Sequence, residues 1–144
     1  MAHRIVNILL VEDSEADADL VREAIEGGKL IINLNVVGDG EEALDYLRRQ
    51  GKFKEALRPD LILLDLNLPK KDGREVLREV KADPDLSLIP IVVLTTSLGD
   101  EDVLQSYQLH ANAYIKKPVD FESFIHIVNK VTEFWLSVVV LPNE

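Results

Sequence analysis

Side chains capable of chemistry follow short apolar stretches of this sequence at regular intervals. The stretches are rich in Val, Ile and Leu, which is typical of buried strands. In an open parallel sheet the ligand crevice lies just beyond the carboxyl ends of the strands, so groups at these positions are candidates for one shared site. They are Glu12, Asp13, Asp65, Thr95 and Lys117.

Three carboxylates at one edge of a sheet require a positive charge between them. Two like charges 4 Å apart repel each other by roughly 4 kcal/mol at an effective dielectric constant near 20. A hard divalent cation offsets that repulsion, and Mg2+ binds through one or two carboxylates plus a phosphate while it keeps several waters. Lys117 would supply a second, fixed positive charge. The residues therefore predict a Mg2+ site.

Each of these residues also has a plainer explanation when it is taken alone. Asp65 could start a turn, Glu12 and Asp13 could cap a helix, and Thr95 could be an ordinary strand residue. An isolated Lys is usually a solvated surface residue. The three histidines show no metal-ligand spacing and are interpreted as surface or packing residues. They are His3, His110 and His126.

The elements that must position the candidate residues alternate regularly between strand and helix. Strands are expected at residues 5–11, 32–37, 61–64, 89–94 and 113–115. The first helix is expected to run from a cap at Asp13 or Ser14 to Gly27, and the others to lie at 43–47, 76–80, 100–109 and 120–135. Such strict alternation predicts a parallel sheet with helices on both faces and right-handed crossovers. Residues 48–58 are expected to form a surface loop.

Composition limits the classes of function. The chain has 144 residues, which is enough for one domain with its own hydrophobic core. It contains no Cys, which excludes thiolate sites and favours a cytoplasmic location. It has no apolar run of the roughly 18 residues that a membrane-spanning helix needs. The formal net charge of -10, from 26 acids and 16 bases, argues against a nucleic-acid partner, because binding to phosphates needs clustered Lys and Arg.

Taken together, these residues resemble the receiver domain of two-component response regulators. The set comprises an acidic pair, an Asp followed by LNLP and further on by DG, a Thr, and a Lys-Pro pair. Asp65 and Thr95 are separated by 30 positions, and Thr95 and Lys117 by 22. The resemblance covers about residues 7–130. It implies a doubly wound α/β fold of the flavodoxin-like, CheY-like type, with five parallel strands in the order 2-1-3-4-5.

The resemblance also implies a role for each residue at the metal site. Asp65 would accept a phosphoryl group from a phosphohistidine on a partner sensor histidine kinase. Asp13 would bind Mg2+ directly, Glu12 would act mostly through a bound water, and Asn67 would contribute its backbone carbonyl. In phosphoryl transfer the protein mainly positions the reactants and neutralises charge, which agrees with these assignments.

The remaining implied roles concern the response to phosphorylation. Thr95 would donate its hydroxyl to a phosphoryl oxygen, and Lys117 would neutralise charge there. Tyr114 matches the aromatic residue that swings inward when Thr95 moves toward the phosphate, and Pro118 matches the proline of a cis peptide. Thr96 departs from the family, in which this residue is usually small, so an altered rate of phosphorylation or hydrolysis is expected.

The end of the chain narrows the resemblance. Residues 1–136 would form the receiver domain and 137–144 a C-terminal extension, with no separate output domain. The segment FWLSVVVLP at 134–142 is similar to single-domain regulators that partner bacterial and cyanobacterial phytochrome histidine kinases. Output is therefore expected to be a protein contact.

The sequence leaves other functions open. A haloacid-dehalogenase-like phosphatase would also use Asp65 as nucleophile, but it needs a second acid two residues later, where this chain has Asn67. A binding-only receiver that takes no phosphate is disfavoured because the acceptor set is complete. A nucleotide-binding flavodoxin-like protein would need a Gly-rich phosphate loop, which the sequence lacks.

The expected last helix is apolar on more than one face. A helix that packs on one sheet face needs a single apolar stripe. The additional apolar surface, with the run at 138–141, predicts a homodimer through this helix and the strand before it, although the tail could instead fold back on its own core. The apolar residues are Phe121, Phe124, Ile125, Ile127, Val128, Val131, Phe134, Trp135 and Leu136.

Overall fold

The computed structural model describes residues 5–26, 31–66, 68–95 and 113–116, together with Glu122 and His126. Its elements follow the predicted alternation of strand and helix. They are β1 (Val6–Val11), α1 (Glu15–Glu26), β2 (Ile32–Val37), α2 (Gly40–Leu47), the short 3-10 helix η1 (Gly51–Phe53), β3 (Leu61–Asp65), α3 (Gly73–Ala82), β4 (Ile91–Thr95) and β5 (Ala113–Lys116). The expected helix at 100–109 lies outside the described residues, as does the one at 120–135 except for Glu122 and His126, which are helical and exposed.

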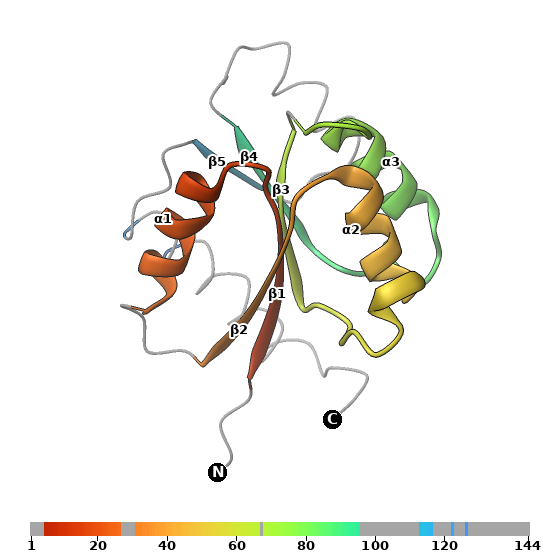
Figure 1. Ribbon diagram of the computed structural model, residues 1–144, viewed down its shortest axis with the longest axis horizontal. Coiled ribbons are helices and arrows are strands. Elements are labelled where there is room, and N and C mark those ends of the chain that lie inside the picture. Colours follow the sequence, from red (N-terminus) through yellow and green to blue (C-terminus); the bar gives the residue numbers. More distant parts are fainter. Residues whose placement is uncertain are drawn as a thin grey trace.

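The strands form one parallel sheet in the order β2-β1-β3-β4-β5, which confirms the predicted fold. β3 lies at its centre (Figure 1). The register places Val11 opposite both Val37 and Leu64, and Asp65 opposite Leu94. The carboxyl ends of the central strands therefore meet at one edge of the sheet.

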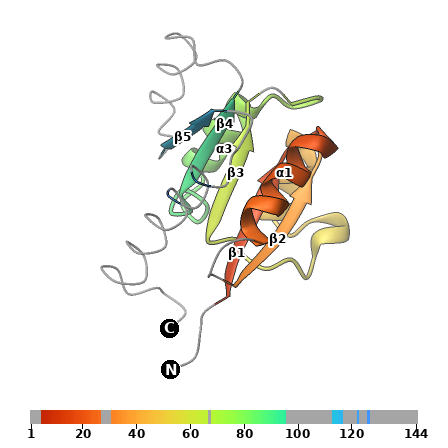
Figure 2. The same cartoon turned by 90° about the vertical axis from the view of Figure 1, so that its left-hand side faces the viewer.

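Helices cover both faces of the sheet. α1 lies on one face, and α2 and α3 lie side by side on the other (Figures 1 and 2). Alternate residues of the strands supply the two cores, as the two-residue period of a strand requires. Leu9, Ile62 and Leu64 pack with α2 and α3, whereas Ile8, Leu10 and Leu63 pack with α1.

The first helix buries a narrower face than its apolar residues suggest. Its buried residues are Ala18, Val21 and Ala24. Ala16 and Leu20, two further apolar residues of this helix, are exposed. The buried residues recur every three positions and form a narrow strip on the sheet, and Ile25 beside it is only partly buried against the same core.

The start of β4 and the content of the loop at 48–58 differ from the sequence expectation. β4 begins at Ile91 rather than Ile89, because Pro90 has no N–H to donate to the ladder and Ile89 instead closes a turn with the Leu86 carbonyl at 3.0 Å. The loop 48–58 contains η1, whose Phe53 packs edge to face on Tyr46 with ring centroids 5.2 Å apart. An aromatic contact thus anchors a segment expected to be irregular.

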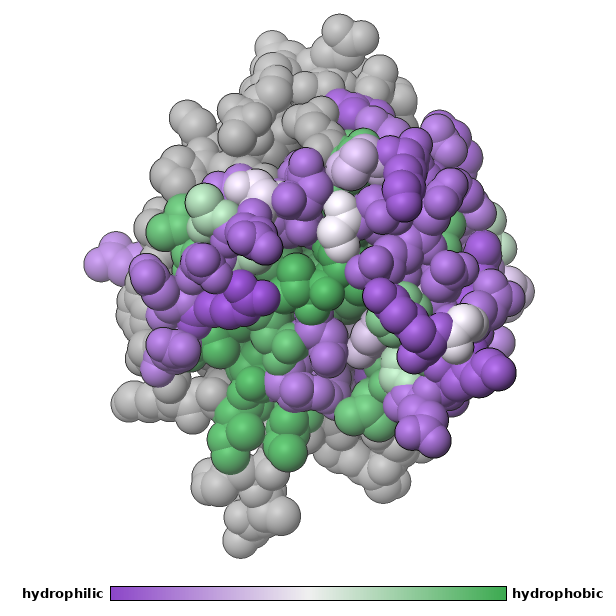
Figure 3. All heavy atoms as spheres, in the orientation of Figure 1, coloured by the Kyte–Doolittle hydropathy of each residue, from purple (hydrophilic) through white to green (hydrophobic). Residues whose placement is uncertain are grey.

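β2 is the edge strand next to β1 and is only partly buried, which agrees with the alternation of polar and apolar residues in its sequence, INLNVV. On the side of α1, Ile32, Leu34 and Val36 pack against the core. Apolar residues gather along this strand in Figure 3, while the surface over α2 and α3 is hydrophilic. On the opposite face Asn33 Nδ2 donates to Asn7 Oδ1 at 3.0 Å.

No helix in the described part of the chain is long and apolar enough to cross a membrane.

The carboxyl end of α2 has a backbone conformation that favours glycine. The Gln50 N–H donates to the Asp45 carbonyl at 2.9 Å and the Arg49 N–H to the Tyr46 carbonyl at 3.2 Å, which is a Schellman motif. Arg49 occupies the left-handed position of that motif with φ 56°. A residue with a Cβ is strained there, because the Cβ crowds the following carbonyl.

We predict that Arg49→Gly raises the free energy of unfolding by about 0.5–1 kcal/mol. Glycine relieves the backbone strain at this position, and its greater conformational entropy in the unfolded chain offsets part of that gain. For a domain of this size that is an increase in Tm of about 2–4 °C. Thermal unfolding followed by circular dichroism measures it. Arg49→Ala is the matched control, since it removes the same side chain but keeps the Cβ. An equal gain from both variants would show that the guanidinium, and not the backbone, is the source of strain.

Candidate metal centre

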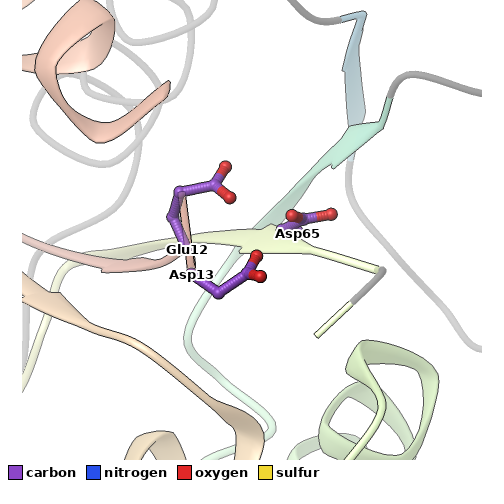
Figure 4. Close-up of side chains that lie close together, drawn as sticks. All are labelled: Glu12, Asp13 and Asp65. Carbon is purple, nitrogen blue, oxygen red and sulfur yellow. The ribbon is translucent and has the colours of Figure 1, made fainter. Parts of the chain in front are cut away.

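Three acidic side chains converge at the carboxyl edge of the sheet. Glu12 and Asp13 follow β1 and Asp65 ends β3, and a carboxylate oxygen from each lies within 4.8 Å of the others (Figure 4). Glu12 is 3% exposed and Asp65 4% exposed, whereas Asp13 is open to solvent. Two of the acids thus lie in the protein interior beside a third that solvent can reach.

The backbone of the segment after β1 fixes the two consecutive acids. The Glu12 N–H donates to the Val37 carbonyl at 2.9 Å, which carries the β1-β2 ladder one residue past the end of β1. Glu12 Oε2 accepts from the Ser14 N–H at 3.3 Å. Ser14 then caps α1, because its Oγ accepts from the Asp17 N–H at 3.2 Å. Of the two caps that the sequence allowed, Ser14 is the one used, which leaves the Asp13 carboxylate available to a ligand.

Asp65 is held by the central strand and by the start of α3. Its backbone lies opposite Leu94 in the ladder, and Leu66 behind it is fully buried. The Gly73 N–H donates to the Leu66 carbonyl at 3.0 Å, and Asp72 caps α3 by accepting from the Arg74 N–H at 2.7 Å. The loop that follows Asp65 is therefore closed by the first residue of the next helix.

The donor set fits a hard divalent cation. All three side chains offer carboxylate oxygens, which suit Mg2+, Mn2+ and Ca2+ rather than softer metals that prefer thiolate or imidazole. In the described part of the chain this is the only group of three or more His, Cys, Asp or Glu side chains close enough to share an ion. The metal site predicted at this edge thus has its three carboxylates together.

The other predicted residues are placed only in part. The register sets the backbone of Thr95, at the end of β4, opposite Lys116, and Tyr114 opposite Val93. β4 is the neighbour of β3, so the backbone of Thr95 lies one strand away from Asp65 at the same edge. The side chains of Thr95 and Tyr114 lie outside the described part of the structure, as do all of Asn67, Thr96 and Lys117.

Comparison with known proteins identifies this arrangement. The response regulator receiver domain family matches residues 8–129. The chain belongs to this family. Response regulator Rcp1 of Synechocystis sp. is 50% identical over 135 residues, covering 94% of this chain and 92% of that protein.

Two solved structures resemble this receiver domain over nearly their whole length. One is the phosphorylated cyanobacterial phytochrome response regulator RcpA, with 51% identity, a TM-score of 0.81 and coverage of 98% of this chain and 99% of that one. The other is the Mn2+-bound form of Rcp1, with 49% identity, a TM-score of 0.80 and coverage of 95% and 99%. The predicted family is confirmed, which favours the receiver over the phosphatase alternative.

One feature of the site escaped the sequence analysis. Gly38-Asp39-Gly40 has the composition of a turn, but Asp39 is the N-cap of α2, with Oδ1 accepting from the Glu42 N–H at 2.8 Å, and Gly40 is the first helical residue. Asp72-Gly73 plays the same part for α3. The repeated Asp-Gly pair was the signal available in the sequence. Its meaning depends on which backbone lies against each glycine, which the sequence does not show.

We predict that Asp13→Asn raises the stability of the metal-free receiver domain and lowers its affinity for Mg2+. Removing one of three like charges relieves repulsion, by on the order of 1 kcal/mol because solvent screens Asp13. Saturating Mg2+ at 100 times its Kd would stabilise the wild type by about 2.7 kcal/mol and the variant by less. Thermal unfolding with and without Mg2+ measures both effects.

Glu23→Gln is the control for this experiment, because Glu23 is an exposed acid on α1 away from the site. It removes the same charge from the chain, so it should leave the response to Mg2+ unchanged. Equal stabilisation of wild type and Asp13→Asn by Mg2+ would contradict the metal assignment.

Proposed function

We propose that this chain is a single-domain response regulator that accepts a phosphoryl group on Asp65 from a phosphohistidine of a sensor histidine kinase. The observation that carries the proposal is the convergence of Glu12, Asp13 and Asp65 within 4.8 Å, with Asp65 at the end of the central strand of a receiver fold. An acceptor at the carboxyl end of a central parallel strand can be approached by a partner protein from outside the sheet.

The transfer exchanges one bond to phosphorus for another. A carboxylate oxygen of Asp65 attacks the phosphorus atom, and the P–N bond to the kinase histidine breaks with its electron pair remaining on the imidazole nitrogen. Attack by water on the aspartyl phosphate later returns Asp65 to its carboxylate and releases inorganic phosphate. The protein catalyses only these two steps on itself. Its task in them is to position Asp65 and to neutralise the charge on the transferring oxygens.

The proposed cofactor is Mg2+, held by Asp13 directly, by Glu12 mostly through water, by Asp65 and by the Asn67 carbonyl. A divalent ion there supplies neutralising charge for the phosphoryl oxygens. Burial of Glu12 and Asp65 strengthens that interaction, since charges attract more strongly away from bulk water. Thr95 and Lys117 are proposed as phosphoryl contacts, and Thr95 with Tyr114 as the switch.

The proposed kinase is of the phytochrome type. The support for this proposal is that RcpA is a cyanobacterial phytochrome response regulator and is 51% identical to this chain. The net charge of -10 supports output through protein contacts rather than through nucleic acid. The absence of Cys supports a cytoplasmic location. Residues 1–136 would form the receiver domain, with 137–144 as an extension.

We predict that Asp65→Asn abolishes phosphorylation while the domain stays folded. The amide cannot act as the nucleophile, and it lowers the charge at the site, so stability without Mg2+ should rise if it changes. Incubation with acetyl phosphate and Mg2+, followed by a phosphate-affinity gel, measures the product.

Asp45→Asn is the matched control, because Asp45 is exposed on α2 away from the three acids. It should be phosphorylated like the wild type. Full phosphorylation of Asp65→Asn would refute the acceptor assignment, and a wild type that takes no phosphate from acetyl phosphate or from a phytochrome kinase would indicate a binding-only receiver.

We also propose a homodimer through the expected helix at 120–135 and β5. The apolar surface of that segment exceeds what one sheet face can cover, which supports a second copy of the chain as the partner. Sedimentation velocity of the full chain and of a truncation after Phe134, each with and without phosphorylation, measures association. Dimers of the full chain that the truncation weakens are expected, and a monomer in every condition at tens of micromolar rules the dimer out.

A further inference from the structure

Gly40, the first residue of α2, lies against the loop that follows the phosphoacceptor strand. A Cβ built at this glycine would lie 2.1 Å from the Lys71 carbonyl oxygen and 2.9 Å from the Lys71 carbonyl carbon. Real Cβ atoms essentially never come closer than 3.0 Å to such neighbours. The obstacle is backbone, which cannot rotate away as the end of a side chain could. Glycine is therefore required by the close approach of α2 to this loop.

Gly73, the first residue of α3, makes the matching contact at the other end of the same loop. A Cβ there would lie 2.3 Å from the carbonyl oxygen of Asp65 itself and 2.6 Å from the Leu66 Cα. Residues 65–66 and Lys71 thus lie against the first turns of two helices, each of which touches them through a glycine. One contact is made directly to the backbone of the phosphoacceptor.

Polar contacts connect the same loop to α2 and α3. Lys70 Nζ lies 3.6 Å from Oδ2 of Asp39, the N-cap of α2. Lys71 Nζ donates to Glu79 Oε2 on α3 at 2.7 Å, and Arg48 NH2 lies 3.4 Å from Glu79 Oε1. The hydrogen bond from Lys71, with help from Arg48, holds the pKa of Glu79 below its usual value. The loop is therefore attached to both helices of its face.

We propose that Gly40 is a positioning residue for the Asp65 site: its contact with the Lys71 carbonyl sets the position of residues 71–73, and Gly73, which lies against the Asp65 carbonyl, passes that position on to the alignment of Asp65 with Glu12 and Asp13. The inference rests on the proposed function and adds to it a residue on a different element, separated by 25 positions from Asp65. α2 thus takes part in metal binding although none of the three carboxylates belongs to it.

The expected consequence of a side chain at this position follows from the distances. A methyl group at residue 40 forces α2 and the loop apart by about an ångström, the difference between 2.1 Å and the closest distance that Cβ atoms adopt. Without the contact, Ala would be the better helix former and the substitution would be neutral or stabilising. Mutation of residues that hydrogen-bond to metal ligands typically lowers metal affinity by roughly 10–100-fold. Gly40 acts on Asp65 through Lys71 and Gly73, so the low end of that range is expected.

The test compares Gly40→Ala with Gly38→Ala. Gly38 lies two residues earlier, and a Cβ there would meet nothing within 4 Å. Val21→Ala is a second control, because it weakens the core on the α1 face, where Val21 is 1% exposed, without touching the loop. Mg2+ affinity by isothermal titration calorimetry, Tm, and the rate of phosphorylation by acetyl phosphate are measured for all four proteins.

Gly40→Ala should bind Mg2+ roughly tenfold more weakly than the wild type and accept phosphate more slowly, while Gly38→Ala behaves like the wild type. Val21→Ala should lower Tm and leave Mg2+ affinity unchanged, which separates positioning from stability. If Gly40→Ala is partly unfolded, trimethylamine N-oxide restores the folded state for the same titration.

Unchanged Mg2+ affinity in Gly40→Ala overturns the inference and leaves the proposed function intact. A variant that stays unfolded even in the osmolyte also overturns it, since the contact is then a requirement of folding. A wild type that binds no Mg2+ overturns the proposed function itself.

Discussion

Repulsion among three carboxylates is the constraint on which the site depends. Parallel strands bring their carboxyl ends to one edge, and here that geometry places Glu12, Asp13 and Asp65 within 4.8 Å of one another. The cost falls on the folded state, because in the unfolded chain Asp65 is far from the consecutive pair Glu12 and Asp13. The buried ladder of β1, β3 and β4 opposes it with aliphatic side chains that are almost entirely excluded from solvent. The stability that the buried sheet provides thus allows three like charges to lie close together, where they can bind a divalent cation.

Sequence reasoning predicted the sheet well because the relevant signals are local. Each central strand is a short apolar run, the order of elements is strictly alternating, and the acids follow directly after the runs. Residue spacing then places Glu12, Asp13 and Asp65 together once the strands are parallel. The boundary of β4 was wrong by two residues for an equally local reason, the missing N–H of Pro90.

Features that depend on tertiary contact were not predictable in the same way. Nothing in residues 48–58 shows that Phe53 packs on Tyr46, and nothing around Gly40 shows that the Lys71 carbonyl lies against it. The burial of α1 was also narrower than its composition suggested, since the sheet and not the helix decides which residues are covered. In each case the deciding neighbour is distant in the sequence.

The composition of β2 has a consequence for the behaviour of the protein at high concentration. An edge strand offers unpaired backbone groups to other chains, and a run of β-branched residues there promotes intermolecular pairing. In β2 the residues Asn33 and Asn35 interrupt an otherwise aliphatic strand, and Asn33 donates its amide to Asn7. These amides place polar groups on one face of the edge strand, where Asn33 is exposed and Asn35 partly exposed. Because Asn is disfavoured in strands and adds polar surface, the two amides make β2 a poorer template for amyloid-like pairing than an entirely aliphatic strand would be.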